Sequence, residues 1–205
     1  MHELRDVAFA DKTTAYAELE ASLRSLLEGE PNAIASAANM SALLYWSLPQ
    51  LNWVGFYFLE ETSGDLVVGP FQGKPACVRI PLGRGVCGTA AAERRTIVVP
   101  DVHAFAGHIA CDSASNSEVV VPLIRDGHLL GVLDIDSPVV NRFDTEDAHG
   151  LEALVRVYLE ATRGLERAAA YALCSAVVDL RISEAVDVPY PLVSALLPLD
   201  VFDPG

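Results

Sequence analysis

The 205-residue sequence predicts an α+β domain in which a central antiparallel sheet carries helices on both faces, followed by a C-terminal extension. Two observations support this class. Apolar residues follow helical spacing twice, then the pattern of several strands, a helix, more strands and a closing helix. The connections between strands are short, and short connections join antiparallel neighbours. We place the domain at residues 10–163 and the extension at residues 164–205.

Periodicity and boundary residues predict each element in turn. Apolar residues at intervals of three or four, with proline at several ends, predict helices over residues 13–31, 33–48 and 144–162, and a shorter helix that begins within 81–93. Aromatic and β-branched residues predict strands at residues 52–59, from 66, 76–80, 96–99, 118–124 and 129–136. The polar stretch 101–117 is a long loop, and such loops in compact domains are usually functional or mobile.

The extension has a different character from the domain. Residues 167–180 are expected to continue or follow the last helix, and the rest is apolar but broken by Pro189, Pro191 and Pro198. Such a tail must bury its apolar surface. We expect it to cover its own domain, and a tail exchanged between two subunits is the less favoured alternative.

The charge balance excludes some classes of function. The chain has 14 basic and 28 acidic residues, a net charge of −14, which disfavours a nucleic-acid groove or an anionic membrane surface as partner. No apolar run is long enough to span a membrane, and the N-terminus lacks a secretory pattern. We therefore expect a cytoplasmic protein.

The four cysteines do not pair in sequence. None forms a C-x-x-C motif, so we expect no metal site, and Cys174 lies in an apolar stretch typical of a buried residue. Cys111 lies among small polar residues, where a thiolate nucleophile is plausible. A cysteine that is oxidised during a reaction needs a second thiol, and Cys77 and Cys87 are available. Three separate buried thiols are an equally acceptable interpretation.

Three carboxylates are expected close together. Asp134 and Asp136 are two apart on one strand and so share a face, and Glu118 begins the partner strand. Three neighbouring carboxylates cannot all ionise easily, so one of them would hold a proton near neutral pH. Such a group is either a general acid or an anchor for a ligand ammonium group. The alternative is a solvated acidic edge.

Other residues suit a small ligand. The spacing Gly83-x-Gly85-x-x-Gly88 matches a dinucleotide fingerprint by count, but the βαβ context is missing. Glycines at a helix start instead expose N–H groups that suit a carboxylate. Trp53 and Tyr57 alternate on one strand face and either belong to the core or wall an apolar pocket. The binding candidates are Trp53, Tyr57, Gly85, Val86, Cys87, Glu118, Asp134 and Asp136.

The motifs together resemble one family. Over roughly residues 10–162 the chain resembles the GAF-domain free methionine-(R)-sulfoxide reductases. The resemblance is carried by residues 52–57, 69–77, 85–88, 108–118, 131–137 and 142–144. It implies a three-layer GAF fold, usually a homodimer, without metal or organic cofactor. The implied substrate is free methionine (R)-sulfoxide.

The resemblance also implies roles for the cysteines and acids. Cys111 would attack the sulfoxide sulfur while an acidic side chain protonates the oxygen, which releases methionine and leaves a sulfenic acid. Cys77 would then form a redox-active disulfide with Cys111, to be reduced by thioredoxin. Cys87 matches a third family cysteine that either relays the disulfide or is itself the catalytic thiol. The acids implied in the pocket are Glu118, Asp134 and Asp136, with Trp53 and Tyr57 as pocket aromatics.

Two other functions stay open at this point. A GAF sensor would bind a small molecule without turnover, and residues 141–144 resemble a stretch of cyclic-nucleotide-binding GAF domains. Arg142 departs from that stretch, and an acidic pocket would repel phosphate. A redox switch would use oxidation of Cys77 and Cys111 to change a partner surface, and would not need the carboxylates.

Overall fold

The chain divides into two compact units, Met1–Thr162 and Arg163–Gly205. The structure is a computed structural model that describes residues 11–107, 109, 113–162, 179–184 and 192–196. Within this described part, no helix is both long and apolar enough to cross a membrane.

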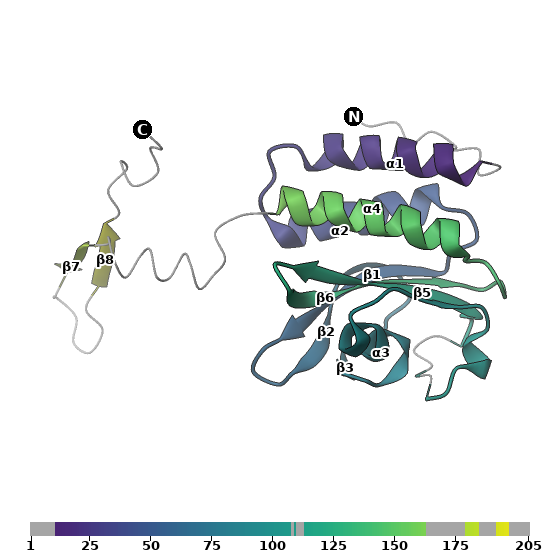
Figure 1. Cartoon of the computed structure of the whole chain (residues 1–205). Coiled ribbons are helices and arrows are strands. Elements are labelled where there is room, and N and C mark those ends of the chain that lie inside the picture. Colours follow the sequence, from purple (N-terminus) through teal and green to yellow (C-terminus); the bar gives the residue numbers. More distant parts are fainter. Residues whose placement is uncertain (1–10, 108, 110–112, 163–178, 185–191, 197–205) are drawn as a thin grey trace. The chain divides into compact units, whose positions relative to one another are not determined.

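A six-stranded sheet forms the centre of the first unit (Figure 1). Its strand order is β3-β2-β1-β6-β5-β4, and every neighbouring pair is antiparallel, as predicted. The strands are β1 (Trp53–Glu60), β2 (Asp65–Gly73), β3 (Arg79–Pro81), β4 (Ile97–Val99), β5 (Ser117–Arg125) and β6 (His128–Ser137).

Helices cover both faces of this sheet. One face carries α1 (Lys12–Leu27), α2 (Ala33–Ser47) and α4 (Thr145–Ala161), and the other carries α3 (Gly85–Glu93) (Figure 1). Side chains define their starts, because Asp11, Asn32 and Asp144 accept hydrogen bonds from first-turn N–H groups. The first helix ends at Leu27 rather than at the predicted residue 31, since Gly29 takes a φ of 76°. A 3-10 turn (Val102–Ala104) follows β4.

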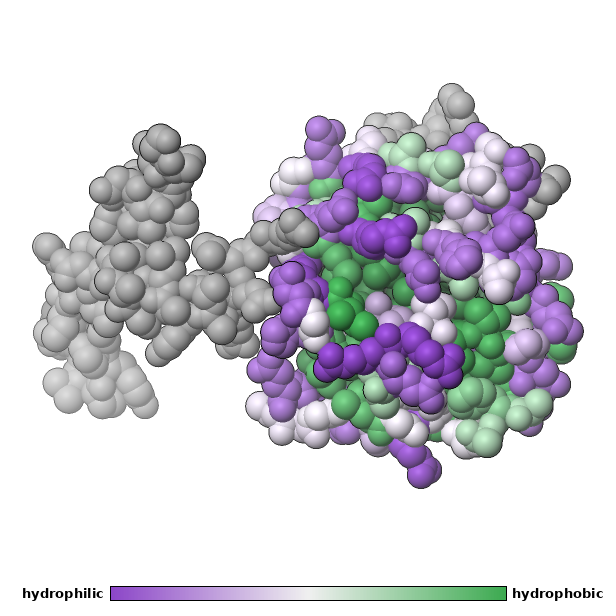
Figure 2. Space-filling model, in the orientation of Figure 1, coloured by the Kyte–Doolittle hydropathy of each residue, from purple (hydrophilic) through white to green (hydrophobic). Residues whose placement is uncertain are grey.

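The sheet separates two hydrophobic cores. Successive residues of a strand point to opposite faces, so Val54 and Phe56 pack against α1, α2 and α4 whereas Trp53 and Tyr57 pack on the side of α3. The smaller core around α3 is therefore the one that contains the candidate ligand-binding residues. On the face of the molecule that Figure 2 shows, hydrophilic residues dominate the surface, with apolar residues visible between them.

A buried carboxylate links α1 to the start of α4. The Asp147 side chain is fully buried, and its oxygens lie 2.7 Å from Lys12 Nζ and 3.4 Å from Arg142 Nη1. Tyr16 donates its hydroxyl to Asp147 Oδ1 at 2.9 Å, and the backbone N–H of Asp144 donates to Oδ2 at 3.0 Å, which completes a capping box. The first helix is thus held in place by charge as well as by apolar contact.

Asp147→Ala is expected to lower the free energy of unfolding by about 3–5 kcal/mol, because it leaves buried cationic and hydroxyl groups without their acceptor. Urea denaturation measures the loss. Glu146→Ala is the matched control, since Glu146 is exposed on the same turn, and its effect should stay within about 0.5 kcal/mol. Equal stability of the two variants would contradict the assignment of Asp147 as the centre of this network.

The second unit contains a hairpin. Its strands β7 (Asp179–Glu184) and β8 (Leu192–Leu196) pair antiparallel. The sequence predicts a helix up to residue 180 and a proline-broken tail beyond it, whereas the strands cover residues 179–180 and part of that tail. Alternation of Leu180 and Ile182 with polar neighbours is the signal for a strand that could have been used. The rest of the extension lies outside the described residues.

Candidate active site

The strand register brings the predicted carboxylates together on the α3 side of the sheet. Glu118 of β5 is the cross-strand partner of Asp136 on β6, and Asp136 is also the partner of Trp53 on β1. Asp134 precedes Asp136 by two residues on the same face of β6 and is the cross-strand partner of Gly55 on β1. These side chains line one pocket with other residues, which are Tyr57, Pro75, Ala76, Ile80, Gly85, Val86, Cys87, Ile109 and Ser115.

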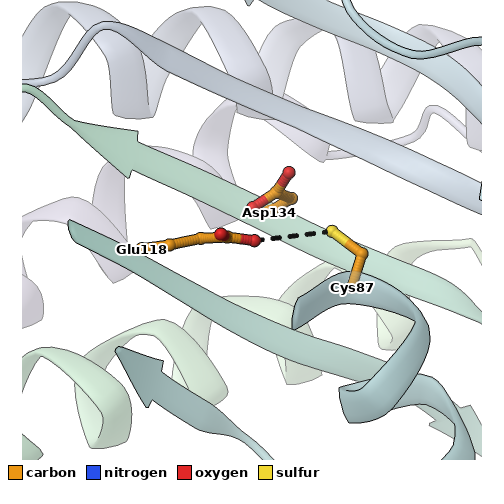
Figure 3. Close-up of side chains that lie close together, drawn as sticks. All are labelled: Cys87, Glu118 and Asp134. Atoms are coloured by element: carbon orange, nitrogen blue, oxygen red, sulfur yellow. Dashed lines mark hydrogen bonds between the residues drawn. The ribbon is translucent and has the colours of Figure 1, made fainter. Parts of the chain in front are cut away.

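The centre of the pocket is a buried group of one thiol and two carboxyls. Cys87 comes from the first turn of α3, Glu118 from β5 and Asp134 from β6 (Figure 3). Their exposed fractions are 4%, 5% and 6%, and Cys87 Sγ lies 3.8 Å from Glu118 Oε1. Asp134 Oδ1 is buried and has no hydrogen-bond partner within the described part of the chain. A ligand could supply that partner.

Burial and mutual repulsion set the protonation of this group. Burial, followed by the charges of Asp134 and Asp136, raises the pKa of Glu118 well above its usual value. Burial also raises the pKa of Asp134 to about 6. The pair therefore holds a proton near neutral pH, and we assign it to Glu118. Burial and the neighbouring carboxyls likewise raise the pKa of Cys87, so this residue is a thiol rather than a reactive thiolate.

We expect Asp134→Asn to change how stability depends on pH. In the wild type the pKa of Asp134 is about 6 when folded and near 3.8 when unfolded, so the folded state binds more protons between these values. The stabilisation that the protonated Asp134 carboxyl provides is fully present below its pKa in the unfolded state. It is lost as the pH rises through the pKa of the folded state. Relative to the variant, the free energy of unfolding of the wild type should fall by up to about 3 kcal/mol between about pH 4 and pH 7.

Urea denaturation at intervals across this pH range measures the difference between wild type and variant. Parallel stability curves for wild type and Asp134→Asn would contradict the raised pKa of this carboxyl.

Aromatic rings form one wall of the pocket. Trp53 stacks between two other rings, and its ring centroid lies 5.7 Å from that of Tyr57 and 5.3 Å from that of Phe71. A side chain at Gly55 would overlap the Trp53 ring, which explains why glycine faces Asp134 there. Trp53 Nε1 also donates a hydrogen bond to the Lys74 carbonyl at 3.1 Å, so the aromatic wall is tied to the segment that precedes Cys77.

The start of α3 offers backbone donors to the same pocket. Gly85, Val86 and Cys87 are its first three residues and line the pocket, and Arg84 at the N-cap provides no side-chain cap. The N–H groups of a first helical turn have no partner within the helix, so they suit a carboxylate. Gly88 lets this turn approach β3 closely, because a Cβ there would overlap the Pro81 carbonyl.

The two cysteines that the structure describes differ in burial and in oxidation state. Cys87 is a free, buried thiol, whereas Cys77 is half-buried before β3 and is disulfide-bonded. Cys111 and Cys174 lie outside the described residues, so the predicted role of Cys111 is not tested by geometry. Sequence reasoning missed Phe71 beside Trp53 and five residues that line the pocket, which are Pro75, Ala76, Ile80, Ile109 and Ser115. The available signal was the position of all of these except Ile80 within the family motifs at residues 69–77 and 108–118.

The pocket center also contains potential metal ligands. Cys87, Glu118 and Asp134 each offer one ligand atom, and these atoms lie within 4.8 Å of one another. A divalent cation could be held by one sulfur and two oxygens. The raised pKa values of Cys87 and Glu118 instead favour protons on these two groups at neutral pH. The absence of a metal cofactor stays a prediction.

Comparison with known proteins identifies the class to which this fold and pocket belong. The family model of the GAF domain matches residues 21–158, so the chain is a GAF-domain protein. The free methionine-R-sulfoxide reductase of Escherichia coli is 56% identical over 145 residues, which cover 71% of this chain and 87% of that protein. The enzyme of the same name from Saccharomyces cerevisiae is 43% identical over 146 residues, covering 68% and 81%.

A solved structure narrows the class further. The free methionine-R-sulfoxide reductase of Neisseria meningitidis, crystallised with its substrate, matches with a TM-score of 0.75 and 45% identity over 80% of this chain and 98% of that one. The chain thus belongs to the free methionine-(R)-sulfoxide reductase family. This confirms both the predicted fold class and the resemblance seen in the sequence.

Proposed function

We propose that this protein reduces free methionine (R)-sulfoxide to methionine by thiol chemistry. The observation that carries the proposal is the buried pair of Glu118 and Asp134, which retains a proton inside a pocket walled by Trp53. A sulfoxide is a poor electrophile until its oxygen is protonated, so a thiol reductase needs such an acid. The relatives with substrate-bound structures support the same reaction.

Each reaction step has a candidate residue. Glu118 donates its proton to the sulfoxide oxygen while the Cys111 thiolate attacks the sulfur. The S–O bond of the substrate then breaks as the hydroxyl is transferred to the Cys111 sulfur, and the temporary bond between the two sulfurs breaks as methionine leaves, so that Cys111 becomes a sulfenic acid. The Cys77 thiol then attacks that sulfenic sulfur, water leaves and a disulfide forms. A dithiol protein, thioredoxin, reduces the disulfide and is itself oxidised. The raised pKa of Cys87 argues against this residue as the attacking nucleophile.

The pocket accounts for a free amino acid as substrate. Asp134, whose Oδ1 has no hydrogen-bond partner within the described residues, and Asp136 suit an ammonium group. Backbone N–H groups at Gly85 and Val86 suit the carboxylate, and the rings of Trp53 and Tyr57 suit the methyl group and the thioether chain. A methionine residue within a polypeptide has neither terminal charge, so these contacts select against it.

Epimer-resolved turnover tests the proposal. The protein is incubated with racemic free methionine sulfoxide and dithiothreitol, and each epimer is followed by chiral chromatography. We expect the R epimer to disappear completely and the S epimer to persist, while an N-acetylated, amidated methionine sulfoxide is not consumed. Binding of the sulfoxide without consumption would replace the proposal by a non-catalytic GAF sensor, and loss of the S epimer would assign the opposite specificity.

The family resemblance also supports a proposal about assembly and location. We propose a homodimer that works in the cytoplasm without an organic cofactor, since a reducing compartment keeps thioredoxin in its dithiol form. Sedimentation equilibrium of the full chain measures the oligomeric state directly.

A further inference from the structure

The segment from Lys74 to Arg84 differs in charge from the rest of the chain. Residues 66–92 contain three basic residues and no acidic one, in a protein whose net charge is −14. All three, Lys74, Arg79 and Arg84, have exposed side chains. Arg79 forms an exposed ion pair with Glu60 at 2.7 Å. The segment thus carries basic residues and no acidic residue of its own on a strongly acidic protein, and Arg84 is exposed within it.

Apolar side chains are exposed in the same segment. Val78 is 64% exposed and Leu82 is 41% exposed, and Val78 directly follows the half-buried Cys77. The strand between them, β3, lies at the edge of the sheet, where another molecule can approach. A few exposed apolar residues with charged neighbours are typical of a small, transient interface rather than of a permanent one.

We propose that this segment, the Lys74–Arg84 surface, is the docking site for the protein that supplies electrons to the Cys77 disulfide. This inference rests on the proposed function. The partner is a dithiol protein with an apolar surface around its attacking cysteine and acidic residues at the rim. Its thiolate attacks one sulfur of the disulfide, a mixed disulfide forms, and its second thiol then releases two reduced cysteines of this chain.

Each part of the surface has a separate contribution. When a partner covers Val78 and Leu82, their apolar surface is removed from water, which stabilises the complex next to Cys77. Arg84 attracts an acidic partner and raises its association rate, an effect that falls as salt screens the charges. A small reductant such as dithiothreitol needs neither contribution. Comparison of the two reductants therefore isolates docking from chemistry.

Val78→Asp removes the apolar contact and adds a repulsive charge. We expect the KM for thioredoxin in sulfoxide turnover to rise about tenfold or more, with the dithiothreitol-supported rate unchanged. Ile34→Asp is the matched control, because Ile34 is 56% exposed on α2, which covers the opposite face of the sheet. The wild-type KM for thioredoxin should also rise with sodium chloride, and that for dithiothreitol should not.

An unchanged thioredoxin KM for Val78→Asp overturns the proposal, as does an equal loss of rate with dithiothreitol. Failure of the proposed function is recognised separately, because the wild type would then consume no sulfoxide with either reductant. In that case the rate at which reduced thioredoxin opens the Cys77 disulfide, followed by thiol labelling and mass spectrometry, still measures docking. Equal rates for wild type and Val78→Asp in this assay overturn it too.

Discussion

Glu118→Gln is expected to lower kcat for free methionine (R)-sulfoxide by about 10²- to 10⁴-fold, the usual contribution of a general acid. Glutamine has nearly the shape of the protonated acid and is neutral, so the pocket should keep its structure and KM should change little. The loss then falls on kcat, as expected for an interaction made only in the transition state. Steady-state turnover with dithiothreitol as reductant measures both constants.

Two controls sharpen this experiment. Glu93→Gln changes an exposed glutamate at the end of α3 and should leave kcat unchanged. The unfolding free energy of Glu118→Gln at neutral pH should stay within about 1 kcal/mol of the wild type, because the carboxyl that it replaces is protonated there. Wild-type turnover by this variant would show that the proton comes from another group, with Asp134 as the next candidate.

The second large effect is expected from the cysteines. When the chain is first reduced and the reductant is then removed, the wild type should release one methionine per chain and stop as a disulfide. Cys111→Ser should release none, because a serine hydroxyl at neutral pH is a far weaker nucleophile than a thiolate. Cys77→Ser should also release one methionine, but the chain should stop with one added oxygen atom, the sulfenic acid that no second thiol resolves.

Quenched-flow chromatography counts the methionine, and mass spectrometry of the intact chain distinguishes disulfide from sulfenic acid. Cys174→Ser is the control and should behave as the wild type. Cys87→Ser should retain the first methionine, because the raised pKa of Cys87 keeps it a thiol. If Cys87→Ser instead abolishes the release of the first methionine while Cys111→Ser does not, the assignment of Cys111 as the nucleophile is wrong.

Local pattern was sufficient for most elements of the first unit. The helix predicted at residues 33–48 is α2 (Ala33–Ser47), and the one predicted at 144–162 is α4 (Thr145–Ala161). The strand β2 was predicted less well, since Gly69 and Pro70 interrupt its pattern, yet it continues to Gly73. Packing explains this continuation: a side chain at position 69 would overlap the Phe58 ring of β1. Such a contact between strands is invisible in a single stretch of sequence.

The candidate site was predictable to the extent that it depends on strand geometry. The alternation of Asp134 and Asp136, and the hairpin that places Glu118 beside them, follow from a period of two, and the register agrees. The position of Cys87 depends instead on how α3 packs on the sheet, so its contact with Glu118 could not be predicted. The position of Phe71 against Trp53 likewise depends on the register of β1 with β2.

The protonated state of Cys87 has a consequence for the lifetime of the protein. Peroxides oxidise thiolates far faster than thiols, and each further oxidation step beyond the sulfenic acid is difficult to reverse. Cys87 lies beside Glu118, the proposed acid, where a sulfinate would add a permanent negative charge. Burial against two carboxyls keeps that sulfur unreactive, so oxidative damage in a stressed cell is directed away from the acid pair.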